Sequence, residues 1–159
     1  MISKKVASLL EEQIGHELWA SQKYLSMAIW FAGQNLGGFS EFFMKQSAEE
    51  RGHALKIVHF LTEVGLTPNL AAIDAAGPKY KDALDCANQA LQNEQTVTKQ
   101  FHKMAKTALA EDDYTSFEFL QWFIKEQVEE EASMEHLIAL ISSGLNLFQV
   151  EALLHHDHD

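Results

Sequence analysis

Six polar residues repeat one spacing in the two halves of this chain, and their types are those of metal ligands. In each half a glutamate is followed 33 residues later by a glutamate or glutamine, and three residues further on by a histidine or glutamate. In chain order they are Glu17, Glu50 and His53, then Glu94, Gln127 and Glu130. Because residues three apart on a helix share one side, each such pair can direct both of its groups to the same point.

The chemistry that these residue types favour is the binding of two divalent cations. Four carboxylates balance the formal charge of two such ions, and the imidazole of His53 adds a nitrogen ligand that suits iron or zinc better than calcium or magnesium. An ionised carboxylate buried without a partner costs more than the net stability of a domain. If these glutamates are buried, metal ions are therefore the expected counter-charge.

The elements expected to position these residues are four long helices and a short fifth one. Apolar periodicity and helix breakers place them at 5–33, 39–64, 82–109, 114–143 and 146–155. Asn35, Gly37 and Gly38 form the expected first turn and 111–113 the third, which predicts two antiparallel hairpins. The 65–81 connection has about 17 residues and can span about 55 Å, whereas a 28-residue helix is about 42 Å long. The predicted fold class is all-α, a four-helix bundle with one long crossover between helices two and three.

Each long helix carries a stripe of residues, in alternating steps of three and four, that is apolar at both ends and polar in the middle. On the third helix the stripe is Leu84, Ala87, Leu91, Glu94, Thr98, Phe101, Ala105 and Ala108. Such steps mark a packed seam, and no lysine or arginine lies on any of the four stripes. The polar residues lie near the helix centres, so the bundle should bring them to one height in its core.

The length, charge and composition of the chain limit its number of domains and the partners that it can bind. Its 159 residues suit one bundle domain, expected over 1–145, followed by the short fifth helix and a tail over 146–159. A formal charge of −11 disfavours nucleic acid and anionic membranes as partners. The one cysteine, Cys86, excludes an intrachain disulfide and every CxxC motif. No apolar run is long enough to span a membrane. We therefore expect a cytoplasmic protein without a nucleic-acid or membrane partner.

Taken together, these residues resemble the non-haem bacterial ferritins over essentially the whole chain. The matching segments are Glu17 with Tyr24, Ala48-Glu49-Glu50-Arg51-Gly52-His53, Asn93-Glu94-Gln95, and Phe119 to Phe123 running into Glu126 to Glu131. The resemblance implies a homo-oligomeric shell of 24 subunits that oxidises Fe(II) with dioxygen or peroxide and stores the iron as a ferric oxide mineral. It also implies that the fifth helix lines channels on the four-fold axes of the shell.

Carried over by position, the resemblance implies two iron ions per subunit. The first would be bound by Glu17, Glu50 and His53, and the second by Glu50, Glu94 and Glu130, with Glu50 as the bridge. Gln127 occupies the neighbouring position, where its amide can hydrogen-bond a ligand or water. Tyr24 matches the tyrosine beside the centre of that family, where it can bond a ligand or supply an electron. A tyrosine of the hydrophobic core would fit the same position.

The resemblance also implies a possible third iron site, made by Glu49, Glu126, Glu129 and Glu130. A solvated charged face is the alternative interpretation of Glu49, Glu126, Glu129 and Glu131. The tail over 155–159, with the sequence HHDHD, is interpreted as a disordered terminus rather than a metal site.

Two departures from related families narrow the prediction. Haem-binding bacterioferritins carry a methionine after the bridging glutamate and a second Glu-x-x-His on helix four, whereas this chain has Arg51 and the pair Gln127 and Glu130. We therefore expect no haem. The complete internal ligand set disfavours mini-ferritins, whose site lies between subunits, and the single cysteine disfavours rubrerythrin-like proteins. Two functions remain as alternatives to a ferroxidase: a di-iron oxygenase or peroxidase acting on another substrate, and a slow metal-buffering shell.

Overall fold

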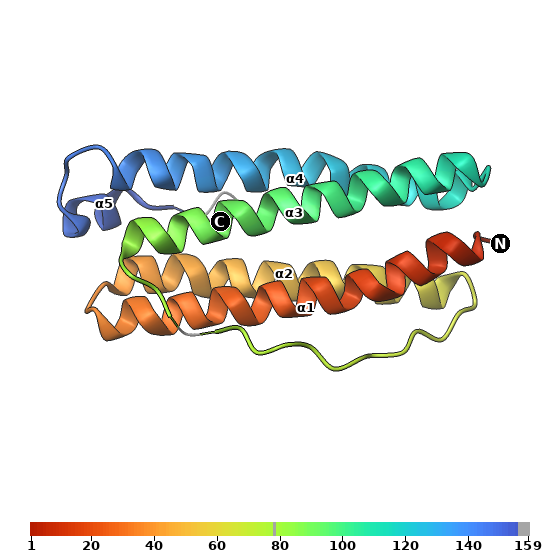
Figure 1. Cartoon of the computed structure of the whole chain (residues 1–159), viewed down its shortest axis with the longest axis horizontal. Coiled ribbons are helices and arrows are strands. Elements are labelled where there is room, and N and C mark those ends of the chain that lie inside the picture. The colour runs from red at the N-terminus through yellow and green to blue at the C-terminus, as the bar shows by residue number, and fades with distance from the viewer. Residues whose placement is uncertain (78, 156–159) are drawn as a thin grey trace.

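The computed structural model describes residues 1–77 and 79–155, and it is built from helices (Figure 1). They are α1 (Lys4–Gly33), α2 (Gly37–Glu63), α3 (Ala83–Ala110), α4 (Tyr114–Ile141) and α5 (Leu147–Leu153). Every predicted helix is present, and each predicted boundary lies within two residues of the observed one. The all-α prediction is confirmed, and no strand occurs in the two described ranges. The tail over 155–159 is predicted to be a disordered terminus. Residues 156–159 of this tail lie outside the described residues.

The four long helices form two antiparallel hairpins, α1 with α2 and α3 with α4, joined by one long crossover (Figure 1). The crossover runs along the whole length of the bundle beside α1, as the length estimate predicted. It is fastened to α1 by side chains: Trp19 Nε1 donates to the carbonyl oxygen of Ala75 at 3.4 Å, and Lys23 Nζ donates to that of Ala76 at 3.1 Å. α1 and α3 thus run in opposite directions and contact each other across the two hairpins.

The start of α2 differs from the prediction, because Gly37 and Gly38 belong to its first turn rather than to the preceding loop. The residue before the helix, Leu36, offers no side-chain cap. The carboxylate of Glu151 on α5 replaces that cap and accepts hydrogen bonds from the backbone N–H groups of Gly38 and Phe39. A Cβ atom on Gly38 would collide with the side chain of Glu151, so a larger residue here would displace the carboxylate that caps α2.

The core consists of two apolar clusters separated by a polar layer, as the helix stripes predicted. The cluster at the α5 end is rich in aromatic side chains, among them Phe31, Phe39 and Phe43. The cluster at the opposite end contains Leu10 and Phe101. Most of the predicted seam is buried.

Leu84 was wrongly placed on this seam, because its side chain is 38% exposed. The buried side of α3 instead passes through Ala83, Cys86, Ala87 and Ala90. These small residues face the bundle at the start of the helix, and Leu84 points away from them. Within the described residues, no helix combines the length and the apolar composition that a membrane span requires.

Candidate metal centre

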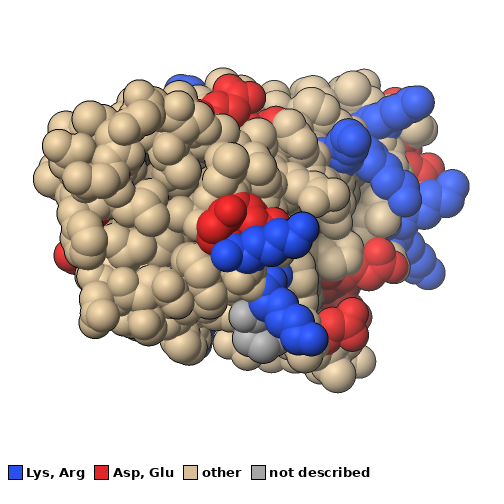
Figure 2. Space-filling model, turned by 60° about the vertical axis from the view of Figure 1, so that its left-hand side comes forward, with Lys and Arg blue, Asp and Glu red and all other residues tan. Residues whose placement is uncertain are grey.

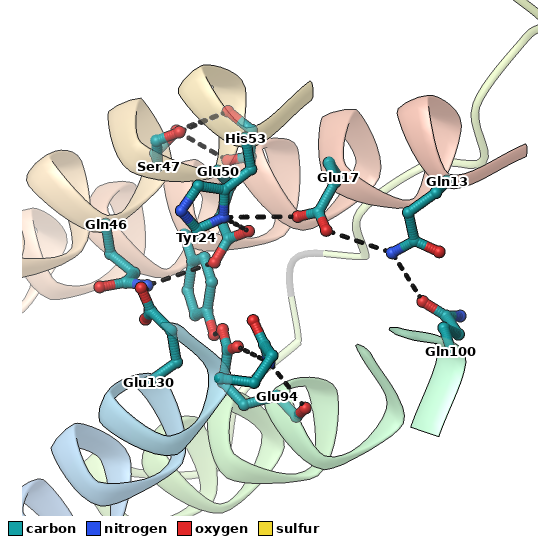
Figure 3. Close-up of polar contacts among 12 residues, drawn as sticks. Gln13, Glu17, Tyr24, Gln46, Ser47, Glu50, His53, Glu94, Gln100 and Glu130 are labelled. Atoms are coloured by element: carbon teal, nitrogen blue, oxygen red, sulfur yellow. Dashed lines mark hydrogen bonds and ion pairs between the residues drawn. The ribbon is translucent and has the colours of Figure 1, made fainter. Parts of the chain in front are cut away.

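The middle of the bundle holds a compact group of acidic side chains from all four long helices (Figure 3). Glu17 comes from α1, Glu50 and His53 from α2, Glu94 from α3 and Glu130 from α4, and none is more than 5% exposed. One ligand atom each from Glu17, Glu50 and His53 lies within 4.8 Å of the other two, and the same holds for Glu50, Glu94 and Glu130. Glu50 belongs to both groups, so one carboxylate lies between two potential metal positions.

The first position is formed by Glu17, Glu50 and His53. His53 Nδ1 lies 3.3 Å from Glu50 Oε2 and 3.8 Å from Glu17 Oε2. Glu17 Oε2 and His53 Nδ1 are both buried, and neither makes a hydrogen bond. A cation between them would satisfy both atoms, and the mixed oxygen and nitrogen donor set fits iron.

The pKa values of this first group move in opposite directions. Burial alone would raise the pKa of the Glu17 carboxyl, but its interactions with His53, Glu50 and Gln13 together outweigh burial and lower the pKa. Burial alone would lower the pKa of His53, but Glu17 and further carboxylates raise it. In the metal-free protein the imidazole and the Glu17 carboxylate therefore stabilise each other as an ion pair.

The second position is formed by Glu50, Glu94 and Glu130, and Glu94 is held from two sides. The phenol of Tyr24 donates to Glu94 Oε1 at 2.5 Å, and Gln127 Nε2 donates to Glu94 Oε2 at 3.0 Å. Gln127 also donates to the backbone carbonyl of Glu94 at 3.2 Å. Its amide nitrogen therefore faces a predicted ligand, which is the hydrogen-bonding role that the sequence left open.

Tyr24 is both a core residue and a neighbour of the centre. Its side chain is fully buried and its ring stacks on that of Phe43, with centroids 5.9 Å apart. Burial and the charges of Glu94 and Glu50 raise the pKa of the phenol well above its usual value. The phenol therefore keeps its proton and acts as a hydrogen-bond donor to Glu94.

The acidic layer holds protons when no metal balances its charge. Burial raises the pKa of Glu50 well above its usual value, and the charges of Glu94 and Glu17 raise it further. Burial and then the neighbouring carboxylates raise the pKa of Glu130 to about 10. For Glu94, burial outweighs its hydrogen bonds and again raises the pKa. These carboxyls can take up divalent cations in exchange for protons.

Only some residues of the predicted third iron site lie close together in the structure. Glu126 is buried, and it forms a further group with His53 and Glu130 whose ligand atoms lie within 4.8 Å of one another. Glu49 is half-buried, and Glu129 is exposed. An accessory site centred on Glu126 and Glu130 therefore stays a prediction, and Glu129 lies at its edge.

Sequence reasoning missed Gln13, a buried residue of α1 whose Nε2 donates to Glu17 Oε1 at 3.1 Å. Its position four residues before Glu17 matches that of Gln46 before Glu50, and this repeat was the available signal. Gln46 is also buried, and its Nε2 donates to Glu130 Oε2 at 2.6 Å. Both amides contact the acidic layer without belonging to it.

Comparison with known proteins agrees with this arrangement. The family model described as the Ferritin-like domain matches residues 7–143, a range that includes every residue of the acidic layer. The chain belongs to the ferritin family. Among curated relatives, Ferritin BfrB of Mycolicibacterium smegmatis is 36% identical over 151 residues, which cover 94% of this chain and 83% of that protein. A bacterial non-heme ferritin of Staphylococcus aureus is 35% identical over 157 residues, covering 95% of each chain.

Solved ferritin structures share the whole fold of this chain. An open pore ferritin from the archaeon Archaeoglobus fulgidus superposes with a TM-score of 0.93 at 32% sequence identity, covering 96% of this chain and 97% of that one. A form of the same archaeal ferritin that was engineered to be closed gives a TM-score of 0.90. The resemblance to non-haem bacterial ferritins is thus confirmed at the level of family and fold, and family membership supports iron storage as the function.

Proposed function

We propose that this chain is the subunit of an iron-storing ferritin that oxidises Fe(II) to Fe(III) at two metal positions in each bundle. The observation that carries the proposal is that Glu50 belongs to two separate three-residue ligand groups. A shared carboxylate holds two Fe(II) ions close enough to give their electrons to the same oxidant molecule. Iron is the substrate of this reaction, and a ferric oxide mineral is its stored product.

The proposed reaction balances with either oxidant. Two Fe(II) ions supply two electrons, and dioxygen with two protons takes them up to give hydrogen peroxide. Hydrogen peroxide with two further protons would take up the next two electrons and give two water molecules. The four glutamates of the two ligand groups offset the positive charge that oxidation adds, and carboxylates can change between terminal and bridging modes as the metal charge rises.

We further propose that copies of this chain assemble into the closed shell, of 24 subunits, that a mineral requires. The α5 end of the bundle supports this, because the stretches 24–40 and 137–150 contain no Asp, Glu, Lys or Arg. Figure 2 turns this end toward the viewer and shows a broad face with few charged side chains. Exposed apolar residues there include Ile29, Phe148 and Leu153, at 63%, 63% and 52%. Such a surface favours contact with further copies of the chain over contact with water.

An anaerobic Fe(II) titration followed by rapid mixing with dioxygen tests the proposal. We expect tight binding to saturate at two Fe(II) per subunit and both ions to be oxidised in the first fast phase. Saturation at one Fe(II), or oxidation no faster than in free solution, would overturn the ferroxidase assignment. A shell that binds iron but oxidises it slowly would identify the metal-buffering alternative. The cytoplasmic location stays a prediction that fractionation of cells can test.

A further inference from the structure

Two buried glutamines outside the ligand set contact the acidic layer at different places. Gln13 and Gln46 are each 1% exposed, and each precedes a ligand glutamate of its own helix by four residues. Figure 3 shows Gln13 on the side of Glu17 and Gln46 on the side of Glu130. The two amides therefore lie on opposite sides of Glu50.

The amide of Gln13 is fixed in orientation by three partners. Its Nε2 donates to Glu17 Oε1 at 3.1 Å and to Gln100 Oε1 on α3 at 3.0 Å, which uses both N–H groups. Its Oε1 lies 3.2 Å from His16 Nδ1. A flipped amide would direct oxygen against the oxygens of both Glu17 and Gln100. The nitrogen end is therefore held toward Glu17.

This orientation determines which oxygen of Glu17 can bind a metal. Oε1 is engaged by the amide, while Oε2 makes no hydrogen bond and lies 3.8 Å from His53 Nδ1. Gln13 thus turns Oε2 of Glu17 into the first metal position. It does so with a neutral group, so the negative charge that attracts a cation is retained.

Gln46 makes the corresponding contact at the second position. Its Nε2 donates to Glu130 Oε2 at 2.6 Å and to Glu50 Oε1 at 3.3 Å. Because Glu130 belongs to α4 and Gln46 to α2, this amide joins the two hairpins at the point where the second position lies between them.

We propose that Gln13 and Gln46 are positioning residues that act mainly on different metal positions, Gln13 on the first through Glu17 and Gln46 on the second through Glu130. The inference rests on the proposed two-metal function and assigns each position its own neutral donor. Removing an outer hydrogen-bond partner of a metal ligand typically weakens metal binding by about 10- to 100-fold. Each variant should therefore weaken one binding step more than the other. A Gln46 variant should also weaken the first step to a smaller extent, because the Gln46 amide donates at 3.3 Å to the shared Glu50.

The test uses stepwise Co(II) binding to the full chain, followed by calorimetry and visible absorption, so that no oxidation is needed. The step that His53→Ala weakens identifies the first position, because His53 belongs to that position and not to the second. We expect Gln13→Met to weaken this same step by about 10- to 100-fold and Gln46→Met to weaken the other step by a similar factor. Gln95→Met is the matched control, because Gln95 is exposed beside Glu94, and it should change neither step.

Two gentler variants keep the test decisive if a methionine variant does not fold. Gln100→Ala removes only the acceptor that fixes the Gln13 amide, and it should weaken the first step alone. Gln46→Asn shortens the donor by one methylene, and it should weaken the second step more than the first. The inference is overturned if a variant of either glutamine weakens both steps equally or neither step. Fewer than two Co(II) bound by the unaltered chain would instead count against the proposed two-metal function.

Discussion

The phenol oxygen of Tyr24 on α1 lies 2.5 Å from Oε1 of Glu94 on α3, so the acidic layer is joined across the two hairpins. The contact links residues 70 positions apart in the chain. The sequence allows Tyr24 to be a core residue or a participant at the centre, and different parts of its side chain serve each role. The ring packs in the core, whereas the hydroxyl donates to Glu94, a predicted metal ligand. Replacing the hydroxyl alone can distinguish them.

Tyr24→Phe keeps the ring that stacks on Phe43 and removes only the donor to Glu94. The metal-free protein should lose about 1 to 3 kcal/mol of unfolding free energy, because a buried acceptor loses its partner. Fe(II) oxidation should also slow, because Glu94 is then less firmly placed at the second position. Urea unfolding and rapid mixing measure the two effects. A loss of stability with an unchanged oxidation rate would leave Tyr24 as a core residue only.

Glu50→Gln should abolish fast oxidation, because it removes the carboxylate that both ligand groups share. An outer hydrogen bond alone is worth about 10- to 100-fold in metal binding, so losing the shared ligand should slow the initial rate by at least about 100-fold. The metal-free bundle should remain folded, since the change also removes repulsion among buried carboxylates. Glu135→Gln, on the exposed side of α4, is the control and should oxidise iron at the original rate. A Glu50→Gln protein with the original rate would refute the site assignment.

The metal-free protein should become less stable as the pH rises from about 4.5 to about 10. The pKa of Glu130 is raised from 4.5 to about 10 in the folded chain, and those of Glu50 and Glu94 are also raised. Above pH 4.5 the unfolded chain releases protons that the folded chain still holds, so the unfolding free energy falls with pH. Glu17, whose pKa is lowered, stabilises the fold above pH 4.5 and loses that effect only in more acidic solution.

Thermal unfolding of the metal-free chain at pH 5.5 and pH 8 measures this dependence. The unfolding temperature should be lower at pH 8, and the difference should be smaller in Glu50→Gln, which removes one of the shifted carboxyls. A metal-free protein that is more stable at pH 8 would contradict the assignment of protons to this layer. Saturating Zn(II) should reduce the difference, because bound metal replaces the protons.

Two variants on the same helix test the predicted accessory iron site. Glu126→Gln changes a buried residue that forms a group with His53 and Glu130, whereas Glu129→Gln changes an exposed one. Both variants should keep the first two-iron oxidation fast. Glu126→Gln should reduce the iron bound beyond two ions per subunit, and Glu129→Gln should alter only later turnovers. A collapse of the first oxidation phase in Glu129→Gln would show that the accessory assignment is wrong.

Local patterns in the sequence predict most of this fold and the gathering of the acidic side chains in one layer. The helix stripes and the repeated 33-residue spacing depend on period and position along the chain, so they indicate which residues reach the core at one height. Contacts between distant elements escape such reasoning. Glu151 caps α2 from α5, 113 positions along the chain from Gly38, and this moves the start of the helix into the glycines. Leu84 is apolar but exposed, because three alanines and a cysteine already occupy the buried side of α3.

The hydrogen-bond partners of the ligands were the least predictable part of the centre. Gln13 is one of several polar residues of α1, so its residue type alone does not distinguish it. Its hydrogen bonds to Glu17 and to Gln100 of α3 form only in the folded bundle. The same holds for Glu126 and Glu129, which the sequence alone treats alike. Burial separates them, because Glu126 is buried against the centre, whereas Glu129, nearly one turn further along α4, is exposed.

The most direct test of the central claim, that two iron ions share Glu50, is the structure of crystals soaked anaerobically in Fe(II), with anomalous maps recorded at the iron absorption edge. We expect two iron peaks about 3.5 to 4 Å apart. One should lie beside Glu17 and His53, the other beside Glu94 and Glu130, and both within bonding distance of Glu50. A single peak in the bundle, or two peaks with no common carboxylate, would contradict this account.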